Sequence, residues 1–306
     1  MAPKKKRVFT EALNPRFGYY YTVNRSLYKG KTKYQKIELL DTDEFGTVLA
    51  LDNITQVAEK NEYQYHEPMV HPALCCHPKP RRVLVIGGGD GGILREVLKY
   101  PTVERVDFAE LDGQVIDFSR KYLAKMNRHS FDDPRVSIHV TDGREWVENH
   151  PGLYDAVIMD MTDPFGPSAM LYTKEFFKAV KRSFRNQNGI FTMHAESPIS
   201  RPTAFNCINR TLKSVFGVVQ PIYLYIQMYA VLWTVALASD GKAVETTRAA
   251  TVERRIKRYG IKGLKVFNGK TLEAMRVPYP YVEEILRKPG KVITDKAPRF
   301  PDHFTV

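Results

Sequence analysis

The chain has 306 residues, of which 43% are hydrophobic and 26% charged, so it is long enough for one large globular domain and a small one. No apolar run approaches the roughly 20 residues that a membrane-spanning helix needs, and we expect no membrane association. The net charge of +12 suggests nucleic acid as a partner, but much of the excess lies in residues 241–306, with 15 Lys or Arg and 7 Asp or Glu. The residues that carry the chemistry described below are acidic, so we expect no nucleic-acid partner.

Residues 1–18 are interpreted as a basic tail. Lys4-Lys5-Lys6-Arg7 looks like a nuclear import signal, but a solvated tail explains the run more simply. No apolar stretch follows these basic residues, so no secretory signal is expected. Cys75, Cys76 and Cys207 cannot all pair with one another, and we expect three buried thiols in a reducing cytoplasm.

Residues 19–58 are predicted to form a small N-terminal β-domain. Its short β-prone runs are separated by turn residues, and they are Tyr19–Tyr21, Ile37–Leu40 and Val48–Leu51. A helix is expected next, over Glu59–Leu74, because Glu62, Tyr65, His66 and Met69 recur at helical spacing. His77-Pro78-Lys79-Pro80 then breaks the helix.

Residues 59–240 are predicted to form an α/β domain with a doubly wound, Rossmann-like parallel sheet, because apolar strands alternate with helices. The strands are expected at Val83–Ile86, Arg105–Ala109, Val136–Val140, Ala156–Met159 and Ile190–Met193. A helix at Ile93–Lys99 follows the first strand, and Ile226–Ala238 is interpreted as a pair of buried strands. Ligands of such a fold bind at the carboxyl ends of the strands. Residues 241–306 form a basic C-terminal extension.

A glycine run, Gly87–Gly92, follows the first strand and opens a helix, which is typical of loops that approach a nucleotide or nucleoside closely. Asp90 lies within this loop. Two anions about 4 Å apart repel by roughly 4 kcal/mol at an effective dielectric of about 20, so Asp90 disfavours a phosphate or the carboxylate of intact S-adenosylmethionine. The loop therefore predicts a nucleoside whose tail ends in an ammonium group.

Two acids end the next two strands. Glu110 follows the glycine loop by about 20 residues, where an acid commonly accepts both hydroxyls of an adenosine ribose. Asp142 could accept the exocyclic amine of adenine, and the backbone N–H of Gly143 could bond a ring nitrogen. Either acid alone could be a solvated strand end, but together they favour nucleoside binding.

Asp160 and Asp163 follow the fourth strand on a turn that contains two prolines, so both can point into one site. Paired acids can bind a metal, act as acid and base, or hold a polycation. Metal binding is the weaker interpretation because no further Asp/His cluster lies at ligand spacing. For Asp163 a helix-capping role is the alternative.

These motifs resemble the polyamine aminopropyltransferases of the spermidine synthase family, over Tyr19 to about Ser239. The segments that carry the resemblance are Val85–Gly92 with Arg95–Lys99 behind it, Tyr65-His66-Glu67, and Asp160–Pro167. The resemblance implies decarboxylated S-adenosylmethionine as donor and a cationic amine as acceptor. It also suggests a homodimer or homotetramer, joined partly through the N-terminal β-domain.

The resemblance assigns a role to each predicted site residue. Asp160 is the general base, and Asp90 holds the aminopropyl amine. The remaining contacts to the methylthioadenosine part are assigned to Gln35, Glu110, Asp142, Gly143 and Pro167. The acceptor is assigned to Tyr65, His66, Asp163 and Tyr229. We expect no metal and no redox cofactor, because a sulfonium is already a good leaving group.

The stretch Gln227–Trp233 lacks the Tyr-Pro-Ser-Gly turn that is usual in spermidine synthases. Residues Trp233–Asp240 and Ala297–Phe300 are more similar to the thermospermine synthase branch. A putrescine-like diamine is the first acceptor hypothesis, and agmatine and spermidine, elongated to thermospermine or spermine, are the alternatives. Two other hypotheses are a methyltransferase that uses intact S-adenosylmethionine, which Asp90, Asp160 and Asp163 disfavour, and a nucleic-acid-binding protein.

Overall fold

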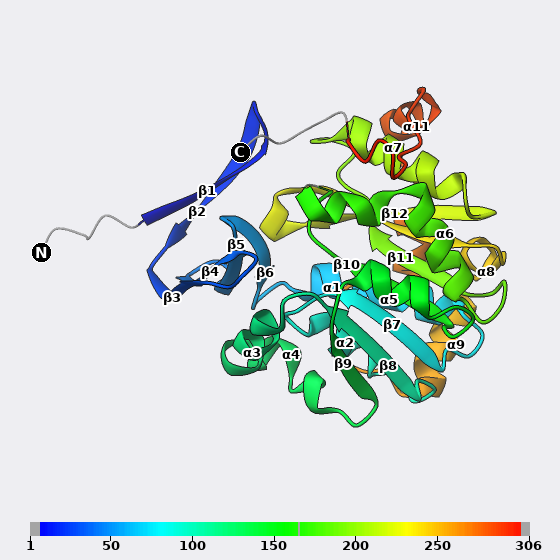
Figure 1. Ribbon diagram of the computed structural model, residues 1–306, viewed down its shortest axis with the longest axis horizontal. Helices are drawn as coiled ribbons and strands as arrows, with labels where there is room; N and C mark the ends of the chain where they lie inside the picture. The colour runs from blue at the N-terminus through cyan, green and yellow to red at the C-terminus, as the bar shows by residue number, and fades with distance from the viewer. Residues whose placement is uncertain (1–6, 165, 301–306) are drawn as a thin grey trace, which may run out of the picture.

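A computed structural model describes residues 7–164 and 166–300 of the chain. It contains a small N-terminal β-domain and a larger α/β domain with a seven-stranded sheet, and helices of the C-terminal region pack against the larger domain (Figure 1). The α/β class and the small β-domain are both as predicted.

The N-terminal domain consists of a hairpin and an antiparallel sheet. The hairpin pairs β1 (Arg7–Asn14) with β2 (Phe17–Val23). The sheet contains, in order, β3 (Arg25–Lys31), β4 (Lys36–Thr42), β5 (Gly46–Leu51) and β6 (Ile54–Ala58).

The prediction that residues 1–18 form a basic tail is wrong for residues 7–18, and residues 1–6, with most of the basic run, lie outside the described residues. Residues 7–18 belong to the hairpin, where Phe9, Leu13 and Tyr21 are buried in the core that the two domains share. Phe9 stacks on Tyr21 at a ring distance of 5.0 Å. These apolar residues alternate with polar ones, as expected of a strand with one buried face.

The large sheet has the order β12-β13-β11-β10-β7-β8-β9. Its five parallel strands match the predicted ones: β7 (Arg82–Gly87), β8 (Arg105–Glu110), β9 (Val136–Val140), β10 (Ala156–Asp160) and β11 (Ile190–His194). The sheet as a whole is not parallel, because β12 (Val218–Ile226) and β13 (Val231–Ser239) form an antiparallel hairpin that pairs with β11. The short connection between them allows no crossover helix, so they must run antiparallel.

Helices cover both faces of this sheet, and alternate strand residues point to opposite faces. One face packs against α1 (Tyr63–Cys76), α2 (Gly92–Val97), α8 (Ala243–Thr246), α9 (Ala249–Tyr259) and α10 (Gly269–Met275). The other face packs against α5 (Gly143–Asn149), α6 (Lys174–Ser183) and α7 (Pro202–Lys213). The N-terminal sheet packs on α3 (Gly113–Tyr122) and α4 (Ala124–Asn127).

Two predicted helices start or end at other residues. The helix predicted over Glu59–Leu74 is α1 and begins four residues later, because β6 continues to Ala58 and a turn follows. The helix predicted over Ile93–Lys99 is α2 and ends at Val97. The remaining elements are the 3-10 turns η1 (Ser130–Asp132), η2 (Gly166–Tyr172) and η3 (Gln227–Tyr229) and the helix α11 (Pro280–Arg287).

The described part of the C-terminal extension, residues 241–300, is folded against the α/β domain. The buried Glu67 of α1 accepts hydrogen bonds from the backbone N–H groups of Lys265, Val266 and Phe267, at 2.8, 2.9 and 2.9 Å. The carboxylate of Glu67 therefore attaches the segment between α9 and α10 to the α/β domain.

The last described residues form a strap beneath the segment that follows β10. Asp295 accepts from Arg144 at 2.9 and 2.6 Å and from Thr173 at 2.6 Å. Phe300 is buried and packs edge-on against Tyr172, whose hydroxyl donates to the Thr162 carbonyl at 3.0 Å. The strap thus supports the segment that carries Asp163.

No helix among residues 7–164 and 166–300 has the length and apolar character needed to cross a bilayer. Cys75, Cys76 and Cys207 are buried, as predicted, and none of them is in a disulfide bond within residues 7–164 and 166–300.

Replacing Glu67 by Ala should destabilise the protein by about 3 kcal/mol, because three backbone N–H groups lose a charged acceptor. The midpoint of urea unfolding, followed by circular dichroism, would measure the loss. Glu284→Ala is the matched control, since Glu284 is exposed on α11. A midpoint for Glu67→Ala as high as that of the control would contradict the role of this carboxylate.

Candidate active site

The predicted site residues gather at the carboxyl ends of β7, β8 and β10, which are neighbours in the sheet. Glu110 is the last residue of β8 and Asp160 the last of β10, while Asp90 lies in the loop between β7 and α2. Parallel strands end at the same edge, so the topology brings together three acids that are far apart in the sequence.

Glycines allow this close approach. Gly88 has φ +74°, and a Cβ at this position would lie 2.9 Å from Oδ2 of Asp160. At Gly92 a Cβ would overlap the imidazole of His66. The loop therefore needs glycine because acidic and imidazole side chains occupy the space that a side chain would fill. Asp90 Oδ1 accepts from the Gly92 N–H at 2.6 Å, which fixes its carboxylate at the start of α2.

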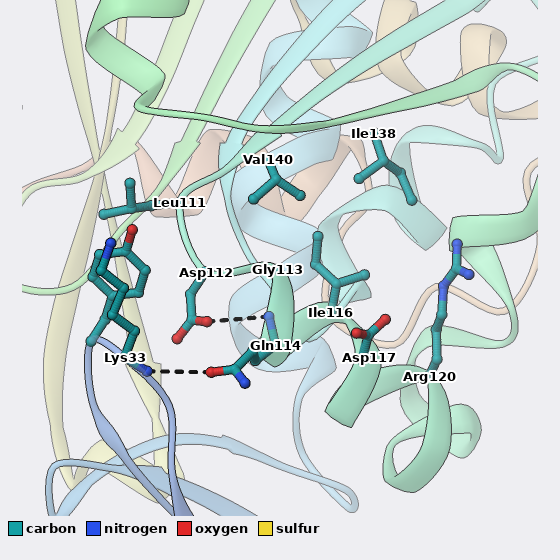
Figure 2. A pocket seen from close by; sticks show the side chains of 11 residues that line it. Lys33, Leu111, Asp112, Gly113, Gln114, Ile116, Asp117, Arg120, Ile138 and Val140 are labelled. Carbon is teal, nitrogen blue, oxygen red and sulfur yellow. Dashed lines mark hydrogen bonds between the residues drawn. The ribbon is translucent and has the colours of Figure 1, made fainter.

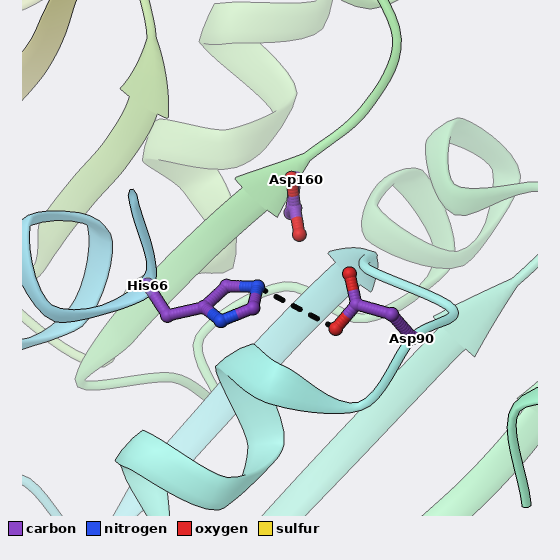
Figure 3. A group of neighbouring side chains, drawn as sticks. All are labelled: His66, Asp90 and Asp160. Carbon is purple, nitrogen blue, oxygen red and sulfur yellow. Dashed lines mark ion pairs between the residues drawn. The ribbon is translucent and has the colours of Figure 1, made fainter. Parts of the chain in front are cut away.

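His66, Asp90 and Asp160 form a compact cluster (Figure 3), in which one nitrogen or oxygen atom of each lies within 4.8 Å of the others. His66 reaches the cluster from α1, and its Nε2 lies 3.5 Å from Asp90 Oδ1. Its Nδ1 lies 2.7 Å from Glu62 Oε2. The imidazole therefore bridges two carboxylates.

This bridging keeps His66 protonated. Burial disfavours the imidazolium, but Asp90 and Glu62 outweigh burial and raise the pKa of His66 to about 10. A doubly protonated imidazole has no lone pair for a metal, although the three residues lie at distances that would suit one. The cluster is better suited to hold the positive charge of an ammonium ion, with His66 balancing part of the negative charge.

Asp160 has the environment of a proton acceptor that works near neutral pH. Burial and the neighbouring Asp90 raise its pKa to about 6, while a hydrogen bond from the Tyr65 hydroxyl at 2.7 Å acts in the opposite direction. A general base is most effective when its pKa lies near the working pH.

Glu110, at the end of β8, is the next acid along this edge of the sheet. Burial, with Asp112 and Asp160 nearby, raises the pKa of Glu110 to about 7, and its Oε1 accepts from the Asp112 N–H at 2.9 Å. Asp112 also accepts from Gln35 Nε2 at 3.2 Å and from Thr32 at 2.6 Å. Gln35 of the N-terminal domain is thereby held next to Glu110.

The other predicted donor contacts lie along the same edge. Asp142 is exposed and caps α5, because its Oδ1 accepts from the N–H groups of Arg144 and Glu145 at 2.7 and 3.1 Å. Gly143 is the first residue of that helix. The side chain of Pro167 lies outside the described residues, so its predicted contact is not tested.

A row of aromatic side chains continues from Asp160 toward Asp163. Successive ring centroids are 6.1, 5.3, 5.7 and 5.9 Å apart along the series Tyr65, Tyr229, Trp233, His194 and Tyr172. Burial raises the pKa of Tyr229, and the charges of Asp160, Glu11 and Asp163 raise it further. Its hydroxyl donates to the Gln56 carbonyl of β6 at 2.9 Å. An apolar wall with acids at both ends is suited to an alkyl chain with charged ends.

Asp163 lies at the far end of this row, where its carboxylate pairs with an arginine. Its Oδ2 accepts from Arg201 Nη1 at 2.7 Å, and the same nitrogen donates to Glu196 Oε1 at 2.8 Å. Glu196 is fully buried, and burial, followed by the charge of Asp163, raises its pKa.

The sequence interpretation missed several residues of this site. These are Glu11 in the hairpin, Glu62 and Arg95 behind His66, Asp112 beside Gln35, and Glu196 with Arg201 behind Asp163. The four-residue spacing of Glu62 and His66 could have suggested their pairing. No local signal connects Arg201 to Asp163, which is 38 residues earlier in the chain.

A separate hollow of about 490 Å³ lies beside the nucleoside site (Figure 2). Its apolar floor includes Ile116, Ile138 and Val140, and Lys33 and Gln114 border it, with the Lys33 N–H donating to Gln114 Oε1 at 3.3 Å. It lies between the loop before β4 and the start of α3. None of the predicted site residues lines it, but Asp112, which bonds to Gln35 and Glu110, does, so the hollow adjoins the predicted nucleoside site.

Comparison with known proteins connects these features to a family. The Spermidine synthase tetramerisation domain matches residues 7–59, and the Spermine/spermidine synthase domain matches residues 62–248. The chain is 38% identical to the polyamine aminopropyltransferase of Nitrosomonas europaea over 285 residues, which are 93% of this chain and 87% of that protein. Identity to the polyamine aminopropyltransferase of Bacillus subtilis is 36% over 251 residues, 81% of this chain and 90% of that one.

Solved structures agree with these matches. Spermidine synthase from Thermotoga maritima superimposes with a TM-score of 0.85 at 33% identity, covering 93% of this chain and 95% of that one. A spermidine synthase in complex with the transition-state analogue AdoDATO superimposes with a TM-score of 0.86 at 32% identity, covering 94% and 98%.

Replacing Glu62 by Gln should lower the pKa of His66 by roughly 1 to 3 pH units, because one of its two carboxylate partners loses its charge. Titration of the His66 ring protons by NMR would measure it. Glu59→Gln is the control, since Glu59 pairs with Lys125 at 3.0 Å. An equal pKa in both variants would show that Asp90 alone keeps His66 charged.

Proposed function

The chain belongs to the spermine/spermidine synthase family and is a polyamine aminopropyltransferase, and we propose that it transfers the aminopropyl group of decarboxylated S-adenosylmethionine to a putrescine-like diamine, releasing methylthioadenosine. The observation that carries the proposal is the acidic edge of the sheet. Asp90, Glu110 and Asp160 meet there beside a glycine loop, and Asp163 lies at the far end of an aromatic wall. This pattern is suited to a nucleoside with a cationic tail and to an amine.

Asp90 supports the decarboxylated donor over intact S-adenosylmethionine. Its carboxylate is fixed by the Gly92 N–H and faces His66 and Asp160. A donor carboxylate here would meet two acids, whereas a primary ammonium would be attracted by both. This feature argues against a methyltransferase built on the same fold.

We assign donor binding to the carboxyl ends of β8 and β9, called here the nucleoside edge. Glu110 would accept the ribose hydroxyls, while Asp142 and Gly143 would contact adenine. Gln35 and Pro167 complete the assignment, and the bonds of Gln35 and Glu110 to Asp112 support the position of Gln35.

The reaction is a direct displacement. The lone pair of a neutral amine attacks the methylene carbon beside the sulfonium, the C–S bond breaks, and its electron pair goes to sulfur to give neutral methylthioadenosine. The proton that the attacking ammonium must lose passes to Asp160, directly or through water, and then to solvent. Alignment of nitrogen, carbon and sulfur supplies much of the acceleration. We expect no metal or redox cofactor, since the sulfonium provides its own leaving group.

A putrescine-like diamine is the proposed acceptor. Its reacting nitrogen would lie near Asp160, its alkyl chain along Tyr65 and Tyr229, and its far ammonium near Asp163. This chain lacks the Tyr-Pro-Ser-Gly turn. The 3-10 turn η3, which ends at Tyr229, lies in that part of the aromatic wall. Agmatine and spermidine are the alternatives.

The proposed chemistry is tested with an acceptor panel. Purified protein is incubated with decarboxylated S-adenosylmethionine and putrescine, agmatine, cadaverine or spermidine, and the products are separated by chromatography and identified by mass. We expect spermidine from putrescine as the main product. Activity with spermidine but not with putrescine would overturn the acceptor assignment, and activity with intact S-adenosylmethionine alone would overturn the donor assignment.

Asp160→Asn should lower turnover by about 10²- to 10⁴-fold while methylthioadenosine still binds, because the proton acceptor is lost and the nucleoside edge is intact. In the wild-type enzyme kcat/KM should rise with pH until Asp160 is ionised, near its pKa of about 6. Stopped assays over pH 5–9 would measure turnover and its pH dependence, and calorimetric titration would measure the binding of methylthioadenosine. Asp117→Asn, at an exposed position, is the control. Turnover near that of the control would rule Asp160 out as the base.

We also propose that the chain forms a homodimer or homotetramer through its N-terminal domain. Val8, Phe17 and Tyr20 of the hairpin are exposed apolar residues, which supports an interface there. Sedimentation equilibrium would give the number of subunits, and a monomer would contradict the proposal. A cytoplasmic location stays a prediction, which three buried cysteines outside disulfide bonds support.

A further inference from the structure

The side chain of Arg201 lies at the far end of the aromatic wall. The Arg201 side chain is 8% exposed and connects Asp163, which is 21% exposed, with the fully buried Glu196. One nitrogen, Nη1, donates to both carboxylates, at 2.7 and 2.8 Å. The guanidinium therefore lies between two acids, Asp163 and Glu196, at the far end of the aromatic wall.

Both domains fix the position of Arg201. Its Nε donates to the Leu13 carbonyl of the hairpin at 3.4 Å, and its backbone N–H donates to the Ser197 carbonyl at 3.0 Å. Glu196 has φ +67°, a strained conformation for a residue other than glycine, and its carbonyl accepts from Thr234 at 2.6 Å. A strained, fully buried acid held opposite a buried arginine is characteristic of a position shaped for function.

The acids at this end of the aromatic wall could also hold an ammonium group if the guanidinium were absent. Within residues 7–164 and 166–300, Oε2 of Glu196 has no hydrogen-bond partner. The oxygen is buried, and a buried carboxylate oxygen without a donor is costly. An ammonium group in place of the guanidinium would find Asp163 and both oxygens of Glu196.

We propose that Arg201 determines the length of the acceptor: its guanidinium occupies the place that the additional ammonium of a triamine would take, and so restricts the enzyme to diamines. The inference rests on the proposed function. A diamine ends at Asp163 and leaves Arg201 in place. A spermidine molecule bound with one end at Asp160 would bring a further positive charge against Arg201, where like charges repel.

Arg201→Met tests this inference, because methionine keeps an unbranched side chain and removes the charge. We expect the ratio of kcat/KM for spermidine to kcat/KM for putrescine to rise about tenfold or more, while the KM for the donor is unchanged. Lys213→Met, which removes an exposed cation at the end of the same helix, is the control. A rise of less than threefold over wild type would overturn the inference.

Two further variants separate charge from packing. Arg201→Lys retains a positive charge and should keep the wild-type ratio. An equal shift in Arg201→Lys and Arg201→Met would overturn a role of the charge. Arg201→Met removes the cation between Asp163 and the buried Glu196, which can prevent folding. The double variant Arg201→Met/Glu196→Gln removes the buried negative charge as well and should show the same rise.

The wild-type enzyme supplies a measurement that needs no variant. Spermidine should compete with putrescine weakly, with an inhibition constant at least tenfold above the KM for putrescine. Equal values would overturn the inference. Failure of the proposed function itself looks different, since the wild-type enzyme would then make no product from any amine, whereas an active enzyme with an unchanged ratio would contradict the role of Arg201 alone.

Discussion

The organisation of this protein depends on the burial of like-charged carboxylates at one edge of a sheet. Asp90, Glu110 and Asp160 would repel one another out of water, and a protonated His66 compensates part of their charge. Behind it, charges alternate in sign toward the surface, along the series Glu62, Arg95, Glu96 and Lys99. Part of this charge is paired, since His66 lies between Asp90 and Glu62, and Arg95 lies between Glu62 and Glu96. A bound cation would offset the charge of the acids that remain.

Much of this could be predicted from the sequence, because the signals are local. The parallel strands β7 to β11 are continuous apolar runs that end in acids, so their positions and the edge at which the acids gather follow from periodicity and fold class. The sequence also shows that the glycine loop contains an acid, Asp90, which a phosphate-binding loop would not be expected to have. Accordingly the acids Asp90, Glu110 and Asp160 do converge in the structure.

The rest could not be predicted because it depends on contacts between distant segments. The hairpin at residues 7–23 was not predicted, because the basic run before it is typical of a solvated tail and its core contacts lie far along the chain. The partner of Asp163 comes from the start of α7, and the partner of Gln35 from the start of α3. An arginine or an aspartate in a loop is usually solvated, so only the tertiary structure distinguishes Arg201 and Asp112 from the other surface charges.

The C-terminal strap has a consequence for how the enzyme is made. Domains fold as units while the chain is synthesised, at about 5–20 residues per second, beginning from the N-terminus. Phe300 supports Tyr172 and Asp295 holds Arg144 and Thr173, so the segment with Asp163 gains its support last. A nascent chain whose residues 295–300 are still inside the ribosome therefore lacks the contacts that support this segment, although the strands that carry Asp90, Glu110 and Asp160 have already been synthesised.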